Sequence, residues 1–143
     1  MMNLVTGVMD SEGFSVGRAA LPEKLLAART GLAGYGRNNI TYVPKAGSYH
    51  RLVALYTDMP CEDYEWQSPS RLDECKNCSA CIRSCPTGCI VEERFLINAS
   101  RCLTYFNESR RPFPSWVNSK WHNAIIGCLK CQMICPANPE LTI

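Results

Sequence analysis

The chain has 143 residues, 46% of them hydrophobic and 20% charged, as in an ordinary globular protein. Its formal net charge of +2 gives no reason to expect a nucleic-acid-binding protein. The sequence has neither the pattern of a secretory signal peptide nor an apolar run of roughly 18 residues, so no membrane helix is predicted. With ten cysteines, we expect a cytoplasmic protein that keeps its thiols reduced as metal ligands.

Residues 1–65 are predicted to form a small α/β segment. A short amphipathic helix is expected to begin near Pro22 and to end before Gly31. A glycine-rich loop follows, with the sequence Gly34-Tyr35-Gly36-Arg37-Asn38-Asn39. Glycine permits close approach of a ligand to the backbone, but the spacing does not match a dinucleotide or phosphate loop. On spacing alone, a ligand-binding loop and a tight surface turn both stay open.

Two strands are predicted after this loop, over residues 40–43 and 49–57, joined as a hairpin by a turn at 45–48. The second strand is apolar on both faces, which indicates a buried position in a larger sheet. Two strands and one helix do not make such a sheet. We therefore expect a partner or an N-terminal segment outside this chain to complete it.

A polar stretch over residues 61–70 is predicted to be a linker, and we place a domain boundary at residue 65. The fold class that follows is α+β. A bacterial-ferredoxin-like module of helices and loops is expected over residues 66–143, preceded by the small, incomplete α/β segment. Within the module, a helix is predicted over residues 99–108, capped by Asn98.

The module contains a run of cysteines with the spacing C-x2-C-x2-C-x3-C-P. In bacterial ferredoxins the first three thiolates of this pattern bind one [4Fe–4S] cluster, and the fourth binds the other cluster of a two-cluster protein. A C-x2-C-x3-C-P run recurs near the C-terminus, with Cys102 upstream as its missing member. The crosswise assignment gives Cys75, Cys78, Cys81 and Cys135 to one cluster and Cys85, Cys102, Cys128 and Cys131 to the other.

Zinc is the main alternative, but a tetrahedral zinc site uses four donors per ion, usually as two separated pairs. A third cysteine at the same short spacing and two Cys-Pro endings fit iron–sulfur clusters better; disulfides are the remaining alternative. Two thiols are left over, Cys61 as an incidental thiol and Cys89 as a packing residue. Structural roles are predicted for His50, His122, Trp66, Trp116 and Trp121.

These residues together resemble the epoxyqueuosine reductase family, whose members carry a double [4Fe–4S] domain. The likeness runs from about Arg18 to Pro139. It is carried by the run from Ala27 to Asn39, the run from Cys75 to Gly88, the lone Cys102, and the run from Gly127 to Pro136.

The resemblance implies that a cobalamin cofactor lies against Gly34–Asn39 and receives electrons from the two clusters. It also implies an electron donor such as flavodoxin or ferredoxin. The chain departs from the family in ways that weaken the transfer of activity. Gly17 stands where the family has a proposed proton donor, so no catalytic residue is predicted. Most of the cofactor-binding domain and the helical extension that holds tRNA are not expected in this chain, so tRNA is not an expected partner.

Three functions follow as hypotheses. The first is the electron-transfer module of a corrinoid-dependent reductase. The second is a free-standing ferredoxin-like carrier without a corrinoid, and the third is a protein in which the clusters are only structural. Redox cycling at accessible potentials would argue against the third.

Overall fold

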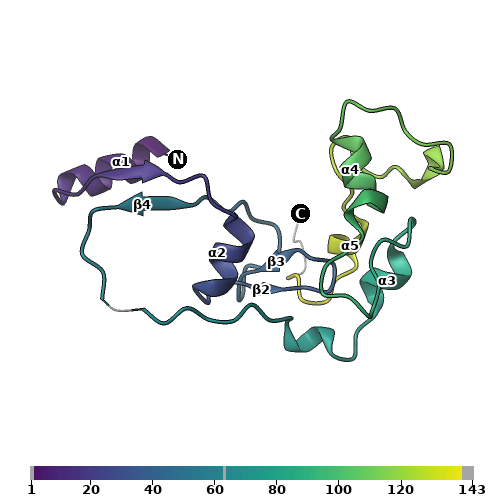
Figure 1. The fold of residues 1–143 in the computed structure, drawn as a ribbon, viewed down its shortest axis with the longest axis horizontal. Coiled ribbons are helices and arrows are strands. Elements are labelled where there is room, and N and C mark those ends of the chain that lie inside the picture. Colours follow the sequence, from purple (N-terminus) through teal and green to yellow (C-terminus); the bar gives the residue numbers. More distant parts are fainter. Residues whose placement is uncertain (1, 63, 140–143) are drawn as a thin grey trace.

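A computed structural model describes residues 2–62 and 64–139 of the chain. Short helices and short antiparallel strands make up its N-terminal part and further short helices its C-terminal part, so the fold is of mixed α and β type. In Figure 1 the first N-terminal elements lie at one end and the helices of the C-terminal part at the other. The strands β2 (Gly34–Tyr35) and β3 (Thr41–Tyr42) lie between them. No helix in the described ranges is both long enough and apolar enough to cross a membrane.

The N-terminal end is an arm of helix α1 (Met2–Ser11) and an antiparallel pair of strands, β1 (Val16–Arg18) and β4 (Leu55–Thr57). Gly17 lies opposite Tyr56 in this pair. Helix α1 buries none of its described side chains, and most residues of the arm are exposed. Figure 1 shows the arm as an extension away from the rest of the molecule.

Helix α2 (Glu23–Arg29) confirms the helix predicted to begin near Pro22. Proline suits this position because its fixed φ is compatible with the start of a helix. Gly31 has a φ of +72°, the left-handed conformation in which helices commonly end. The two buried residues of α2, Ala27 and Ala28, are small enough to let the following chain pack closely against the helix.

The predicted hairpin between residues 40–43 and 49–57 is wrong. The backbone after Val43 turns back at once, since Val43 bridges to Gly47. The chain then leaves, and only Leu55–Thr57 of the second predicted strand forms, paired with β1. Thr41–Tyr42 pairs instead with β2, and Tyr35 of β2 also exchanges backbone hydrogen bonds with Ser70 and Leu72. The glycine-rich loop is thus the tip of a short hairpin, held from its other edge by residues 70–72.

The C-terminal part is built from single turns of helix. These are the 3-10 turns η1 (Asp73–Cys75), η2 (Ala99–Arg101) and η3 (Ser119–Trp121), and the α-helices α3 (Ala80–Ser84), α4 (Leu103–Asn107) and α5 (Lys130–Met133). Helices α3 and α5 pack against each other. The single helix predicted over residues 99–108 is wrong, because the extended backbone of Cys102 divides it into η2 and α4, and the Asn98 side chain makes no capping bond.

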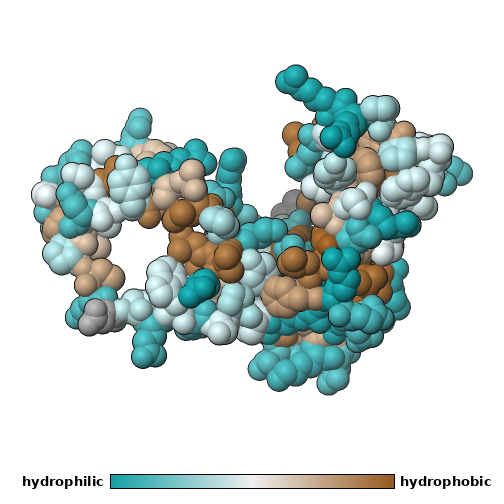
Figure 2. Space-filling view, in the orientation of Figure 1, coloured by the Kyte–Doolittle hydropathy of each residue, from teal (hydrophilic) through white to brown (hydrophobic). Residues whose placement is uncertain are grey.

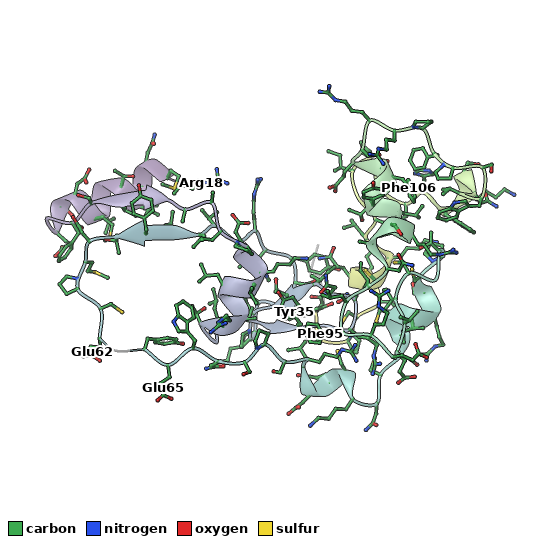
Figure 3. All side chains as sticks on the ribbon, in the orientation of Figure 1. Arg18, Tyr35, Glu62, Glu65, Phe95 and Phe106 are labelled. Carbon is green, nitrogen blue, oxygen red and sulfur yellow. The ribbon has the colours of Figure 1, made fainter. Side chains whose placement is uncertain are left out.

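Buried side chains of the C-terminal part gather around Cys81, Cys89 and Ile90, all under 9% exposed. A separate aromatic group surrounds Phe106 of α4, whose ring lies 5.5 Å from that of Trp116. Figure 3 shows another aromatic contact, Tyr35 against Phe95. Their ring centroids are 5.4 Å apart. Apolar surface is visible over both α2 and the C-terminal part in Figure 2, where Leu21 and Leu25 of the α2 region are exposed.

Candidate iron–sulfur site

The cysteines of the two motifs lie at equivalent places around α3 and α5. Cys81 and Cys131 lie within these helices, Cys85 follows α3 directly, and Cys135 follows α5 after Ile134. Cys102 stands at the start of α4. All ten cysteines carry free thiols. The packing of α3 against α5 therefore brings the end of each motif next to the beginning of the other.

The first thiol site is the group Cys75, Cys78, Cys81 and Cys135. Burial raises the pKa of Cys81, and the charges of Cys75, Cys135 and Cys78 raise it further. Burial also raises the pKa of Cys75, with contributions from Cys135 and Cys78. These four thiols therefore lie near one another, although Cys135 is distant from the others in the sequence.

The second thiol site is the group Cys85, Cys102, Cys128 and Cys131. All four line one cavity of about 320 Å³, which also borders Ile90 and Ile97. Burial, followed by the charges of Cys128 and Cys102, raises the pKa of Cys131 to about 12. The charge of Cys81 acts on Cys131 as well, so the two thiol sites are neighbours.

Four thiols around one cavity can hold a group wider than a single metal ion. Zinc–thiolate bonds of about 2.3 Å would draw four sulfurs to within roughly 4 Å of each other. Within the described ranges, no three Cys, His, Asp or Glu side chains are arranged to hold a single ion. The cavity and the thiols around it thus fit the donor set of an iron–sulfur cluster better than that of zinc.

Cys89, predicted only as a packing residue, lies against the second thiol site. It is 2% exposed, and its sulfur is 3.5 Å from that of Cys85. Hydrogen bonding with Cys89 lowers the pKa of Cys85 to about 4 and also lowers that of Cys102, whereas bonding with both neighbours raises the pKa of Cys89 itself. The contact arises because the chain turns after Cys85, where the Gly88 N–H donates to the Cys85 carbonyl at 3.2 Å, and the Pro86-Thr87-Gly88 sequence is the signal for this turn.

Arg37 of the glycine-rich loop supports the first thiol site. It is 6% exposed, its backbone N–H donates to Cys75 Sγ at 3.4 Å, and its Nη2 donates to the Cys75 carbonyl at 2.6 Å. Its Nη1 also reaches Glu92 Oε1 at 3.3 Å. A cation beside four thiolates offsets part of their negative charge.

Asn38 connects the two thiol sites. Its Nδ2 donates to the Tyr42 hydroxyl at 2.9 Å and to the Cys131 carbonyl at 3.3 Å. Burial, followed by a hydrogen bond with Cys135, raises the pKa of Tyr42 above its ordinary value. Because the Tyr42 oxygen accepts from Asn38, its own O–H remains free to donate to a sulfur at Cys135.

The glycines of the loop are required by packing within the chain. A Cβ on Gly34 would meet Leu72 Cδ2 at 2.6 Å, and one on Gly36 would meet Asn38 and Tyr42. Of the predicted cobalamin contacts Gly34–Asn39, only Asn38 and Asn39 line the cavity of the second thiol site. Asn39 Oδ1 is buried without a hydrogen-bond partner among the described residues, and Lys24 Nζ donates to the Asn39 carbonyl at 3.2 Å.

The two histidines make contacts within the chain, whereas Trp66 and Trp116, for which core packing was the prediction, are exposed. His50 bonds to the Gly47 carbonyl at 3.0 Å, and His122 packs on Phe113. Gly17, where the family has its proposed proton donor, faces the Tyr56 ring in the arm and is not among the residues that line the cavity.

Comparison with known proteins agrees with this geometry. Residues 74–138 match the family model of a 4Fe-4S double cluster binding domain. The epoxyqueuosine reductase of Cyclobacterium marinum is 32% identical over 124 residues, 86% of this chain and 39% of its own. That of Aliivibrio fischeri is 36% identical over 129 residues, 90% of this chain and 33% of its own.

Solved structures give the same result. The epoxyqueuosine reductase of Bacillus subtilis matches with a TM-score of 0.78 at 27% identity, covering 97% of this chain and 37% of its own. That of Streptococcus thermophilus matches with a TM-score of 0.74 at 28% identity, covering 96% of this chain and 39% of its own. The chain thus spans little more than a third of the length of the relatives it matches. It is an epoxyqueuosine reductase-like protein with a 4Fe–4S double cluster domain.

Proposed function

We propose that this chain binds two [4Fe–4S] clusters and serves as the electron-transfer module of an epoxyqueuosine reductase-type enzyme. The observation that carries the proposal is the second thiol site, where cysteines from three separate stretches of the chain line one cavity. When bound, such clusters supply one-electron carriers whose potentials depend on hydrogen bonds and exposure.

The residues of the chain support this role in two ways. The contact between α3 and α5 keeps the two thiol sites adjacent, as electron transfer between them requires. Arg37 and Asn38 then fix the backbone of Cys75 and Cys131 by hydrogen bonds. Metal ligands held in this way keep their orientation when the charge of the bound group changes.

Cobalamin as the acceptor is the finer part of the proposal. Its support is the edge of the cavity formed by Lys24, Asn39 and Ile40, where the Asn39 side-chain oxygen has no partner among the described residues. This edge borders the second thiol site, so a corrinoid bound here would lie beside that site. Arg37 and Asn38 are occupied by Cys75, Tyr42 and Cys131, and we assign them to support of the thiols.

The whole enzyme's substrate and partners are proposed by analogy alone. One epoxyqueuosine reductase has been crystallised with a tRNA stem loop. This chain corresponds to about a third of that protein, and we propose that it takes electrons from a flavodoxin or ferredoxin without binding tRNA by itself.

The test is anaerobic reconstitution of the chain, followed by iron and sulfide analysis and EPR of the reduced protein. Eight irons and eight sulfides with two reducible centres are expected for two [4Fe–4S] clusters. Zinc, or cystines in place of iron and sulfide, would overturn the proposal.

Titration with cobalamin tests the acceptor separately. Binding with a change in the cobalamin spectrum is expected, and it should weaken in Asn39→Ala but not in the control Asn3→Ala, which lies in the exposed helix α1. Two intact clusters without cobalamin binding would contradict the acceptor and favour a free-standing ferredoxin-like carrier.

A further inference from the structure

Cys89 is held firmly between two ligands of the second thiol site. It follows Gly88, whose φ of +60° turns the chain back after Pro86 and Thr87. Its carbonyl accepts from Asn98 N–H at 2.8 Å, which fixes the backbone at this point. The side chain packs with Cys81 and Ile90, and it is the most deeply buried thiol of the chain.

The Cys89 sulfur is within hydrogen-bonding distance of a ligand sulfur, since it lies 3.5 Å from Cys85 Sγ. It lines the same cavity as Cys85 and Cys102. The Thr87 hydroxyl oxygen also lies 3.5 Å from Cys85 Sγ. Metal-ligating cysteines are thiolates, so if Cys85 binds a cluster, the proton of the contact between Cys85 and Cys89 belongs to Cys89.

We propose that Cys89 is not a ligand but a positioning residue that donates its S–H to the ligand sulfur of Cys85 and thereby raises the reduction potential of the second cluster. This inference rests on the proposed function. Reduction adds negative charge that spreads onto the ligand sulfurs, and a hydrogen bond to sulfur stabilises that charge. Burial strengthens the effect because water does not screen the bond.

The first thiol site offers an internal comparison. Its Cys75 receives the Arg37 backbone N–H at 3.4 Å. In the second site Cys128 receives the Asn123 side-chain N–H at 3.3 Å, and Cys85 is contacted by the Thr87 hydroxyl and by the Cys89 thiol. The Cys89 thiol is thus a donor that belongs to the second site alone. A substitution at Cys89 should therefore change the potential of one cluster and leave the other unaltered.

The experiment is an EPR-monitored redox titration of the anaerobically reconstituted full chain, as wild type, Cys89→Ala and Cys89→Ser, with Cys61→Ala as the control for loss of an exposed thiol. Cys89→Ala is expected to retain the iron content of the wild type. At a fixed potential, it should have an about tenfold lower ratio of reduced to oxidised second cluster, equal to about 59 mV for a one-electron couple. Cys89→Ser keeps a donor and should remain closer to the wild type.

Several results would overturn the inference. Equal shifts in Cys89→Ala and Cys89→Ser would show an effect of packing, and no shift in either would remove the role altogether. Loss of the second cluster's iron in both variants would make Cys89 a ligand. Pulsed EPR of the reduced wild type gives an independent check: Cys89→Ala should lose one exchangeable-proton coupling of the second cluster, while the couplings from N–H donors such as those of Arg37 and Asn123 remain. Failure of the proposed function is distinguishable, because it would show in the wild-type iron and sulfide content before any titration.

Discussion

Each of the two thiol sites contains four cysteines, but the two are supported in different ways. The first is held by polar contacts from the N-terminal half of the chain, through Arg37 and Tyr42. The second is lined mainly by the C-terminal part itself, with Ile90, Ile97 and Leu103 around its cavity. The difference between the two sites teaches that the N-terminal segment is part of the first site, although this segment supplies no ligand there.

The largest expected effect comes from exchanging the Cys-Pro ligands. Cys135→Ala should remove the cluster of Cys75, Cys78 and Cys81, and Cys85→Ala should remove that of Cys102, Cys128 and Cys131. In each variant the iron content is expected to fall to about half of the wild-type value, because one of two clusters is lost. If Cys135→Ala instead lost the cluster at Cys128 and Cys131 and retained the cluster at Cys75, Cys78 and Cys81, the crosswise assignment would be wrong. EPR of the reduced variants makes the distinction.

Arg37→Met should destabilise the first site more than the second. The variant loses the guanidinium bond to the Cys75 carbonyl and the charge beside the thiolates, and we expect a loss of about 2 kcal/mol of unfolding free energy. Denaturant titration under anaerobic conditions, followed by cluster absorbance, measures it. Lys76→Met is the control, because Lys76 is a neighbouring cation whose ion pair with Asp73 is exposed. Equal effects of the two substitutions would contradict the support assigned to Arg37.

Gly47→Ala tests the contact between the N-terminal half and the end of the chain. Gly47 has a φ of +69°, and a Cβ there would meet Asn138 Oδ1 and Pro139 Cδ at 2.6 Å. The backbone strain alone costs about 1–2 kcal/mol. Gly88→Ala is the matched control, since Gly88 has a φ of +60° and open space around it. Gly47→Ala should lower the melting temperature further than Gly88→Ala, and the opposite order would show that this contact contributes little.

Tyr42→Phe should have the smallest effect, about 1 kcal/mol, because it removes one hydrogen-bonded hydroxyl and keeps the ring. The loss of the donor to Cys135 should lower the potential of the first cluster and leave the second unaltered. Tyr56→Phe, in the exposed arm, is the control. A redox titration that showed a shifted potential of the second cluster instead would contradict the assignment of the Tyr42 hydroxyl to the first site.

The spacing of the cysteines in the sequence predicted which of them are cluster ligands, because a chain that wraps a compact group has short intervals between its ligands. It also predicted α2, where Pro22 and Gly31 mark the ends. The hairpin failed because pairing is decided by tertiary contacts: Tyr35 finds partners at both Thr41 and residues 70–72, which no local pattern reveals. The helix over residues 99–108 failed at Cys102, where the backbone is extended to place a thiol.

The roles within the glycine-rich loop were not predictable for a related reason. Glycines suggest a ligand, but Gly34 and Gly36 are needed for contact with Leu72 and Tyr42. The position of Asn38 between the two sites depends on a hydrogen bond between its side chain and the Cys131 carbonyl, which is more than ninety residues away in the sequence. Cys89 was identified as a small buried residue, and only the fold shows that it faces other sulfurs.

The pairing of β1 with β4 has a practical consequence. Each of these three-residue strands uses one edge for its partner, and no other strand in the described part of the chain occupies the outer edges. Free strand edges are templates for addition of a foreign strand. At high concentration, self-association should therefore begin at this arm rather than near the cysteines, and shielding those edges is the first measure to try for obtaining well-behaved samples.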